Sequence, residues 1–224
     1  MSTNKKQSIL VLPADVLAQS DQSIISSIVD FINRGYDRNR SKYNLILSQR
    51  IKNSESFFTD LGFDKNQHQS HLFLMIDDWT LITTHFHELF VEFSSKSEPS
   101  RVWYTPIKPL PENISFSSAI ASIGFKPVCN EPGCFEVTGF TSCKPGAGKD
   151  LLQATAKYYN VDLGARRLVA VVIVEHDLLK YYQEIHGFQE VERQLIEKDS
   201  VSETLEDGVV ARSDFTLAKL VKDF

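Results

Sequence analysis

One segment restricts the possible folds more than any other. It runs from Cys134 to Leu152 and reads CFEVTGFTSCKPGAGKDLL. Residues 134–141 predict a strand, the glycine-rich stretch predicts a tight turn, and residues 149–159 have the apolar spacing of a helix. Such a turn leaves backbone N–H groups unpaired at the positive end of the helix dipole. The segment is compatible with an anion site suited to a pyrophosphate, and equally with a plain strand-to-helix turn.

The residues of the turn are of the types that an anion site uses. Gly146 and Gly148 have no Cβ, which lets the backbone approach a ligand closely. Lys144 and Lys149 add positive charge, whereas Pro145 has no N–H to donate. If the glycines serve a ligand, a valine at either position should weaken anion binding more than the loss of Lys149.

Two common nucleotide-binding motifs do not match this turn. A P-loop requires glycine where Cys143 stands and serine or threonine where Asp150 stands. A dinucleotide fingerprint requires a further glycine at the position of Leu151. A degenerate P-loop that binds a nucleotide is therefore a weaker alternative.

The rest of the second half alternates strands and helices. Residues 166–174 (RRLVAVVIV) form a continuous apolar, β-branched run that is typical of a strand covered on both faces. A short helix is expected at 177–187, and further strands at 117–125, 188–196 and 215–221. This order predicts an α/β fold whose sheet has mixed strand directions.

The first half predicts fewer elements. Strands are expected at 8–13 and 71–76. Residues 22–34 have an apolar stripe on one helix face, and Gly35 is expected to end that helix. A second short helix is expected at 54–62, with Ser54 as its N-cap.

Two stretches of the first half leave alternatives open. The basic run NRGYDRNRSKY at 33–43 favours a solvated loop over an anion site. Residues 77–116 are either a hairpin insertion or a loop that packs over a site. His85 and His87 would share one face of a strand there, which favours an ordinary polar strand face over a metal pair.

Composition excludes several classes of protein. A net charge of −5 argues against a large basic face for nucleic acid. The longest apolar run, residues 168–174, is too short to cross a bilayer, and the first residues do not resemble a secretory signal. We therefore expect a cytoplasmic or nuclear protein that binds neither nucleic acid nor membrane. The three cysteines favour free thiols over a disulfide framework or a metal site.

Three segments in order resemble the GNAT superfamily of N-acetyltransferases. Its members hold acetyl-CoA with an [RQ]-x-x-G-x-[GA] loop, and residues 143–148 (CKPGAG) resemble that loop with Cys143 at the Arg/Gln position. Residues 178–188 (LLKYYQEIHGF) resemble the helix that follows the family's fifth strand. Residues 119–127 (AIASIGFKP) resemble the strand that approaches the loop.

The resemblance implies a fold and an organisation. The fold is a GNAT-type mixed, strongly twisted sheet flanked by helices on both faces. The whole chain, 1–224, would be one such domain. Residues 1–113 would be the acceptor-side half, with an insertion at about 77–113, and residues 114–224 would bind acetyl-CoA.

The resemblance also implies direct attack of an amine on acetyl-CoA in a ternary complex, without Cys143 as an acyl carrier. The backbone at Phe140 and Thr141 would stabilise the thioester oxygen. Tyr182 would serve the leaving thiolate, although the family's tyrosine stands four residues before the glycine and Tyr182 stands five before Gly187.

For several residues, the role that the resemblance implies has an alternative. Tyr181 replaces Tyr182 if the helix is wound differently, and Tyr182 is equally compatible with core packing. Glu136 is a candidate general base or a solvated glutamate. The residues expected to bind acetyl-CoA are Phe140, Thr141, Lys144, Gly146, Ala147, Gly148 and Lys149, and no metal is expected.

The acceptor and the assembly are less restricted by the sequence. The acceptor would be an amine-bearing small molecule or a peptide, and the protein a monomer or homodimer. The acidic balance suits a cationic acceptor. The alternative function is a GNAT-fold module that binds CoA or a partner without catalysis.

Overall fold

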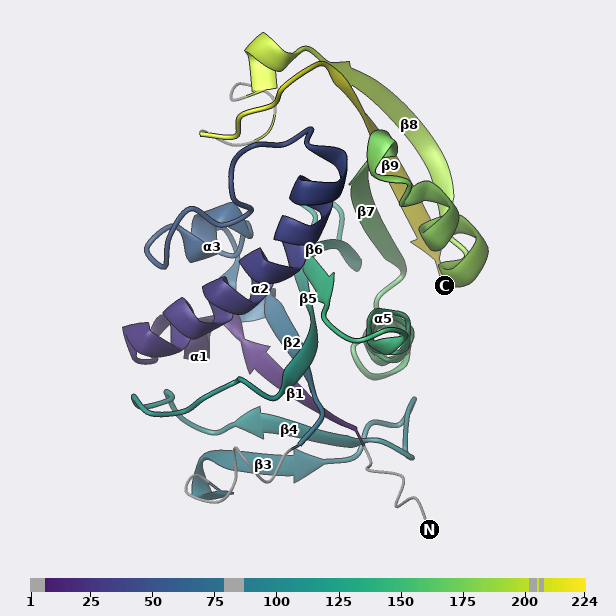
Figure 1. Cartoon of the computed structure of the whole chain (residues 1–224). Coiled ribbons are helices and arrows are strands. Elements are labelled where there is room, and N and C mark those ends of the chain that lie inside the picture. Colours follow the sequence, from purple (N-terminus) through teal and green to yellow (C-terminus); the bar gives the residue numbers. More distant parts are fainter. Residues whose placement is uncertain (1–6, 79–86, 202–204, 206–207) are drawn as a thin grey trace.

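The computed structural model describes residues 7–78, 87–201, 205 and 208–224. Nine strands of this part of the chain form one sheet, in the order β3-β4-β1-β2-β5-β6-β7-β9-β8 (Figure 1). Strands from both halves of the chain share it. The bounds are β1 Ser8–Pro13, β2 His71–Ile76, β3 Phe90–Phe93, β4 Val102–Pro106, β5 Ala119–Pro127, β6 Cys134–Ser142, β7 Arg167–Ile173, β8 Gln189–Ile196 and β9 Phe215–Asp223.

Strand directions are mixed, as the sequence predicts. β1 pairs parallel with β4, and β6 pairs parallel with β7. The other neighbouring pairs are antiparallel. Each strand expected from the sequence is present within two residues of its predicted bounds. The expectation that β7 is covered on both faces holds only in part, because Val171 is 45% exposed.

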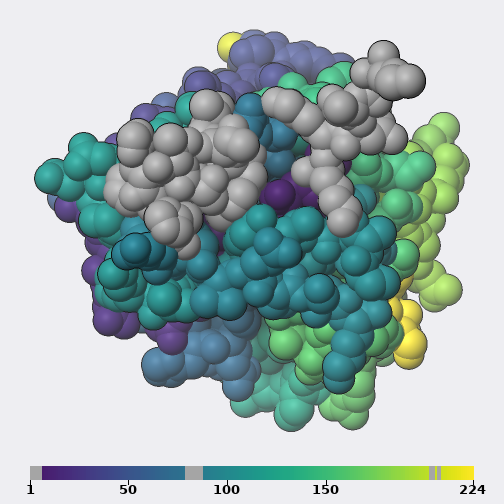
Figure 2. Space-filling view, turned by 90° about the horizontal axis from the view of Figure 1, so that it is seen from below, coloured from purple at the N-terminus to yellow at the C-terminus, as the bar shows by residue number. Residues whose placement is uncertain are grey.

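The stretch at 77–116 contains the antiparallel hairpin of β3 and β4, which confirms the first of its two alternatives. The hairpin extends the sheet beyond β1 and forms much of the surface in the view from below (Figure 2). His85 lies outside the described residues. His87 begins the short 3₁₀ helix η2 (His87–Leu89), so its expected strand position is wrong.

Helix α2 (Gln22–Tyr43) covers one face of the sheet after the short helix α1 (Ala14–Ala18). The Asp21 side chain caps its start by accepting from the Ser23 N–H at 2.9 Å. The predicted end at Gly35 and the predicted loop at 33–43 are wrong, because the helix continues to Tyr43. Gly35 is a packing position: a Cβ there would lie 1.7 Å from Oγ1 of Thr141 on β6.

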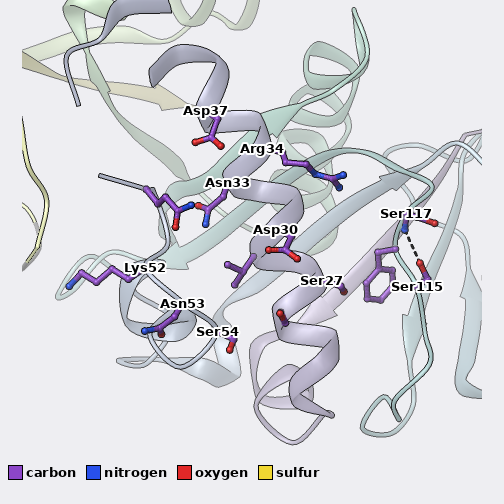
Figure 3. Close-up of a pocket in the computed structure, with 14 residues that line it drawn as sticks. Ser27, Asp30, Asn33, Arg34, Asp37, Lys52, Asn53, Ser54, Ser115 and Ser117 are labelled. Atoms are coloured by element: carbon purple, nitrogen blue, oxygen red, sulfur yellow. Dashed lines mark hydrogen bonds between the residues drawn. The ribbon is translucent and has the colours of Figure 1, made fainter. Parts of the chain in front are cut away.

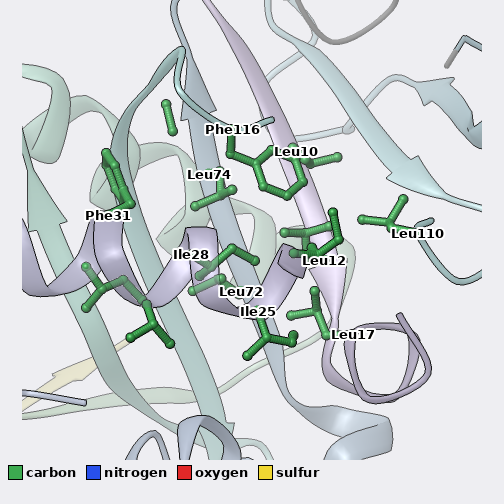
Figure 4. Packing of buried hydrophobic residues seen from close by; sticks show 14 of the residues in the cluster. Leu10, Leu12, Leu17, Ile25, Ile28, Phe31, Leu72, Leu74, Leu110 and Phe116 are labelled. Atoms are coloured by element: carbon green, nitrogen blue, oxygen red, sulfur yellow. The ribbon is translucent and has the colours of Figure 1, made fainter. Parts of the chain in front are cut away.

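The core on this side consists of aliphatic residues of β1, β2 and α2 (Figure 4). Leu10 and Leu74 of the strands pack with Ile25, Ile28 and Phe31 of the helix, and all five are buried. Burying each such side chain contributes about 1.5–3 kcal/mol. This apolar stripe, rather than local helix propensity, keeps α2 helical through an internal glycine.

The second helix of the first half is shorter than expected. It is α3 (Phe57–Asp60), and Ser56 rather than Ser54 precedes it. The Ser56 hydroxyl donates to Asp60 at 2.7 Å, and the backbone N–H of Lys52 donates to the same carboxylate at 2.9 Å. These bonds fix the loop before the helix, so the helix begins later. Gly62, at φ +69°, follows its end as predicted.

Helix α5 (Ala147–Lys157) covers the opposite face and continues into the π-helical turn η3 (Tyr158–Asp162). An aromatic cluster fills the space beneath it, in which Trp103, Tyr159 and Phe125 are fully buried. Asp162 accepts hydrogen bonds from the Ser95 hydroxyl and the Lys96 N–H, both at 2.8 Å, and so attaches the loop after β3 to this helix. None of the helices in the described ranges is both long and apolar enough to cross a membrane.

Candidate active site

The central feature of the site is a separation of two neighbouring parallel strands. β6 and β7 pair only between residues 134–136 and 167–169, although β6 continues to Ser142. Gly139, at φ +53°, lies where the pairing of β6 with β5 shifts register. Its carbonyl accepts the buried Ser122 hydroxyl at 2.8 Å. Beyond Glu136, the edge of β6 that faces β7 therefore has no ladder partner among the described strands.

The register on the other edge shows which backbone groups face this opening. The Cys143 N–H donates to the carbonyl of Ile120 on β5 at 2.8 Å, and Thr141 pairs with Ser122. Because an antiparallel ladder alternates, the N–H of Thr141 points toward β5. The backbone groups of Phe140 and Ser142 point away from β5. The expected donor Phe140 thus faces the opening, Thr141 does not, and Ser142 is a donor that the sequence analysis missed.

The turn after β6 forms an open cradle of N–H groups at the start of α5. Gly146 precedes the helix at φ +82°, and a Cβ on it would meet nothing within 4 Å. The N–H of Ala147 donates to Lys144, and the N–H groups of Gly148 and Lys149 have no acceptor among the described residues. These two donors at a helix N-terminus form a site for an anion.

Gly148 has a different role from Gly146. A Cβ at Gly148 would lie 3.1 Å from Cβ of Ser142 and 3.4 Å from the Phe140 ring. Both neighbours belong to β6. The glycine therefore lets the first turn of α5 pack closely against the strand, whereas the sequence analysis assigned it only to ligand approach.

Three basic side chains surround the cradle. Lys144 forms an ion pair with Asp77 at 2.9 Å. Lys149 is exposed and has no carboxylate within 4 Å among the described residues. Arg38 of α2 donates to the carbonyl of Ser142 at 3.1 Å and to that of Cys143 at 3.5 Å. The sequence signal for Arg38 was the basic run at 33–43, for which an anion site was the less favoured alternative.

Two neighbouring tyrosines come from the π-helical turn η5 (Tyr181–Ile185). Tyr182 is 5% exposed, and burial raises the pKa of its hydroxyl far above the usual value, with smaller effects of Tyr36 and Tyr181. Burial, aided by Asp150, raises the pKa of Tyr181 to about 12. A π-helical turn accommodates an extra residue, which accounts for the longer spacing from Tyr182 to Gly187.

The rings of these tyrosines meet Phe140. Tyr181 stacks on it with centroids 6.2 Å apart, and Tyr182 contacts it edge-on at 6.3 Å. Tyr181 also lies near Asp150 in the first turn of α5. Tyr182 instead lies within electrostatic reach of Tyr36 on α2.

Glu136 is apart from these groups. It lies in the paired part of β6 and forms an ion pair with Lys126 at 3.4 Å, with its side chain 31% exposed. At about 3.3 Å per strand residue it is about 13 Å from Phe140. The structure therefore brings together Phe140, the cradle and the tyrosines, but not Glu136.

A polar groove of about 630 Å³ follows the outer side of α2 (Figure 3). Asp30, Asp37 and Arg34 line it from the helix, with the loop at 49–54 on one side and residues 115–117 on the other.

The described residues contain no group of three or more His, Cys, Asp or Glu side chains that could hold a metal ion. Cys129 is exposed, Cys134 is buried and Cys143 is half-buried, and all are free thiols. Burial raises the pKa of Cys134 to about 11, which keeps it protonated.

Comparisons with known proteins agree with this architecture. The family described as Sporulation protein RMD6 matches residues 1–224. The Saccharomyces cerevisiae protein of that name is 36% identical over 220 residues, which cover 96% of this chain and 94% of that protein.

Solved structures resemble the chain at lower identity. A provisionally named phosphinothricin N-acetyltransferase superposes with a TM-score of 0.52 and 16% identity, covering 92% of this chain and 95% of that one. A GNAT-family acetyltransferase from Streptococcus pneumoniae gives a TM-score of 0.48 and 12% identity, covering 96% and 99%. The chain is therefore a member of the sporulation protein RMD6 family and has the fold of the GNAT acetyltransferases.

Proposed function

We propose that this protein is an acetyl-CoA-dependent N-acetyltransferase that transfers the acetyl group directly to an amine. The observation that carries the proposal is the open cradle at Gly146–Lys149, which follows a strand whose edge toward β7 has no ladder partner beyond Glu136 among the described strands. The cradle suits the pyrophosphate of CoA. The free edge of β6 suits the amide groups of the pantetheine arm, which can pair with it as a further strand would.

The residues of the opening fit the chemistry of the transfer. The neutral amine attacks the thioester carbon, a C–N bond forms, and the C–S bond breaks to release the CoA thiolate. The N–H of Phe140 would stabilise the oxyanion, and one such donor is typically worth about 10²–10³ in kcat. The N–H of Ser142, two residues nearer the cradle, would bind the pantetheine arm. The ammonium proton of the acceptor leaves to water or to a base.

Tyr182 is our candidate for the proton donor to the thiolate. Its raised pKa keeps the hydroxyl protonated at neutral pH, as a proton donor requires. Tyr182 lies within electrostatic reach of Tyr36 on α2, whereas Tyr181 lies within electrostatic reach of Asp150 in the first turn of α5 and would contact the cofactor instead. Tyr182→Phe should lower kcat about 10²-fold or more with unchanged CoA affinity. Tyr181→Phe is the matched control and should retain most of the kcat.

The acceptor is the least defined part of the proposal. The groove along α2 is our candidate entry for an amine, whether on a small molecule or a peptide, because the Asp30 carboxylate that lines it can bind an ammonium group. Arg34 and Lys52 also line the groove, and Asp37 is paired with Arg40 at 2.9 Å, so Asp30 carries this argument. A panel of amines and peptides, assayed by release of free CoA thiol, would identify the class.

Calorimetry with CoA and acetyl-CoA tests the first step. We expect binding of both, and absence of binding at millimolar concentration would overturn the proposal. Binding without thiol release across the whole panel would favour the alternative, a module that holds CoA or a partner without catalysis.

A further inference from the structure

Arg38 occupies an unusual position for a residue of α2. Its guanidinium donates to the carbonyls of Ser142 and Cys143, the last residue of β6 and the first of the turn. The Ser142 carbonyl is on the edge of β6 that faces away from β5. Arg38 therefore lies at the mouth of the opening between β6 and β7, beside the cradle.

The packing of α2 determines this position. Gly35, one helical turn before Arg38, meets Thr141 so closely that no side-chain atom fits between them. The helix therefore has little freedom to slide or rotate at this point. The base of the Arg38 side chain is held next to the end of β6 whether or not a ligand is present.

The charged residues of the turn provide little unpaired positive charge for a bound pyrophosphate. A pyrophosphate diester is doubly negative near neutral pH, yet Lys144 is already paired with Asp77. Lys149 of the turn itself has no carboxylate partner among the residues that the structure describes, and Cys143 supplies no charge where the resembling loops have arginine or glutamine. Arginine has five N–H donors, and the two carbonyls occupy only part of them.

We propose that Arg38 is a phosphate-binding residue, whose guanidinium contacts the pyrophosphate of CoA and supplies from α2 the positive charge that Cys143 does not. This rests on the proposed function. Arginine is suited to the role because its planar guanidinium can bind carbonyl and phosphate oxygens at the same time. It would also connect cofactor binding to α2, the helix that lines the proposed acceptor groove.

The experiment compares Arg38→Gln with Arg34→Gln, which removes the same charge from the same helix one turn earlier, at the groove. Affinities for CoA and for inorganic pyrophosphate are measured by calorimetry, and melting temperatures are measured on the same samples. We expect Arg38→Gln to weaken both affinities about tenfold or more, as loss of a charge-assisted hydrogen bond does. Arg34→Gln should leave both within about twofold, with melting temperatures near that of the parent.

Arg38→Lys covers the case in which Arg38→Gln does not fold. Lysine keeps the charge without the fork geometry, so it should retain part of the affinity for both probes. A folded Arg38 variant without charge that binds CoA as tightly as the parent overturns the inference. The inference is also overturned if an Arg38 variant has a lower melting temperature and loses affinity for pantetheine as much as for CoA. Arg38 would then only hold the turn in place.

The proposed function fails separately from this inference. If the parent binds neither CoA nor pyrophosphate, both fall. If the parent binds CoA and Arg38→Gln does so equally well, only the role of Arg38 falls. If the parent binds pyrophosphate alone, acetyl-CoA chemistry is refuted, and the pyrophosphate affinity of Arg38→Gln still decides the role of Arg38.

Discussion

Two glycines lie beside the carboxyl end of β6, one in α2 and one immediately before α5, and they are required for opposite reasons. On the α2 side, a Cβ on Gly35 would lie 1.7 Å from Thr141, so the glycine is there because no atom fits. On the α5 side, a Cβ on Gly146 would meet nothing within 4 Å, and its φ of +82° is what requires glycine. The carboxyl end of β6 is thus closed by packing on its α2 side and left open at the turn before α5, which is what a strand needs if it is to be held rigidly while it binds a ligand.

The strongest test of the closed contact is Gly35→Val. The side chain would overlap Thr141 on a strand that cannot move without disturbing β5, so we expect a loss of about 3 kcal/mol in the free energy of unfolding. Urea denaturation measures it. The milder Gly35→Ala combined with Thr141→Gly removes the overlapping atoms and should be more stable than the sum of the two single changes predicts. Additive effects of that pair would contradict the assigned contact.

Gly148→Val probes the contact between the two regions, where α5 packs on β6. Its Cβ would come 3.1 Å from Ser142, and Phe140 is also close, so we expect a stability loss of about 2 kcal/mol. CoA affinity should fall as well, because Phe140 and Ser142 line the opening. If Gly148→Val lowers CoA affinity while the urea midpoint stays unchanged, Gly148 serves the ligand alone, as the sequence suggested.

These glycines show how far the sequence could be read. The strands followed from alternation and β-branched runs, and the turn at 143–148 was recognisable because all its residues are contiguous. The length of α2 could not be predicted from the sequence, because Gly35 is required by its contact with Thr141, which lies far later in the chain. A local sequence pattern instead predicts that an internal glycine ends the helix. Arg38 was missed for the same reason, since its partners are Ser142 at the end of β6 and Cys143 in the turn, more than 100 positions later.

The rest of the site could not be predicted for a different reason, which is the local geometry of the backbone. The register of β5 and β6 decides that Phe140 and Ser142, rather than Thr141, face the opening, and a register of this kind is not visible in one strand's sequence. The π-helical turn that carries Tyr182 likewise changes the spacing that a motif relies on. Which tyrosine serves the thiolate, and whether Glu136 takes part, stay predictions.

Gly146→Ala tests the open turn between β6 and α5, and Gly164→Ala is its matched control. Both glycines have positive φ, +82° and +70°, and a Cβ on either meets nothing within 4 Å. Each substitution should therefore reduce the free energy of unfolding by about 1 kcal/mol through backbone strain. CoA affinity should fall only for Gly146→Ala, by about tenfold, because only that Cβ would enter the cradle. Equal CoA affinity in the two variants would show that the pyrophosphate does not bind in the cradle.

The smallest expected effect concerns His186, which lies on the open side of β6 and ends the helix that carries Tyr181. The side chain is 4% exposed, its Nε2 has no hydrogen-bond partner in the described part of the chain, and its ring centroid lies 4.7 Å from that of Tyr181. Burial, with smaller contributions from Lys222 of β9 and Lys149 of α5, lowers its pKa to about 4. Between pH 6.5 and about 4 the unfolded chain therefore binds a proton that the folded chain does not, so stability falls as the pH falls through this window.

Between pH 7 and pH 6, His186 should account for a loss of less than about 1 kcal/mol. His71 and His176 also have pKa values lowered by burial, so the parent must be compared with His186→Gln, in which the pH dependence should be shallower. An anion in the cradle would offset the charge of Lys149 and raise the pKa of His186. Saturating CoA should therefore reduce the pH dependence of the parent but not that of the variant, when stability is measured by urea unfolding across this range. If CoA changes the pH dependence equally in both proteins, the bound anion lies away from Lys149. The open side of β6, at the turn before α5, would then lack the ligand that distinguishes it from the closed α2 side.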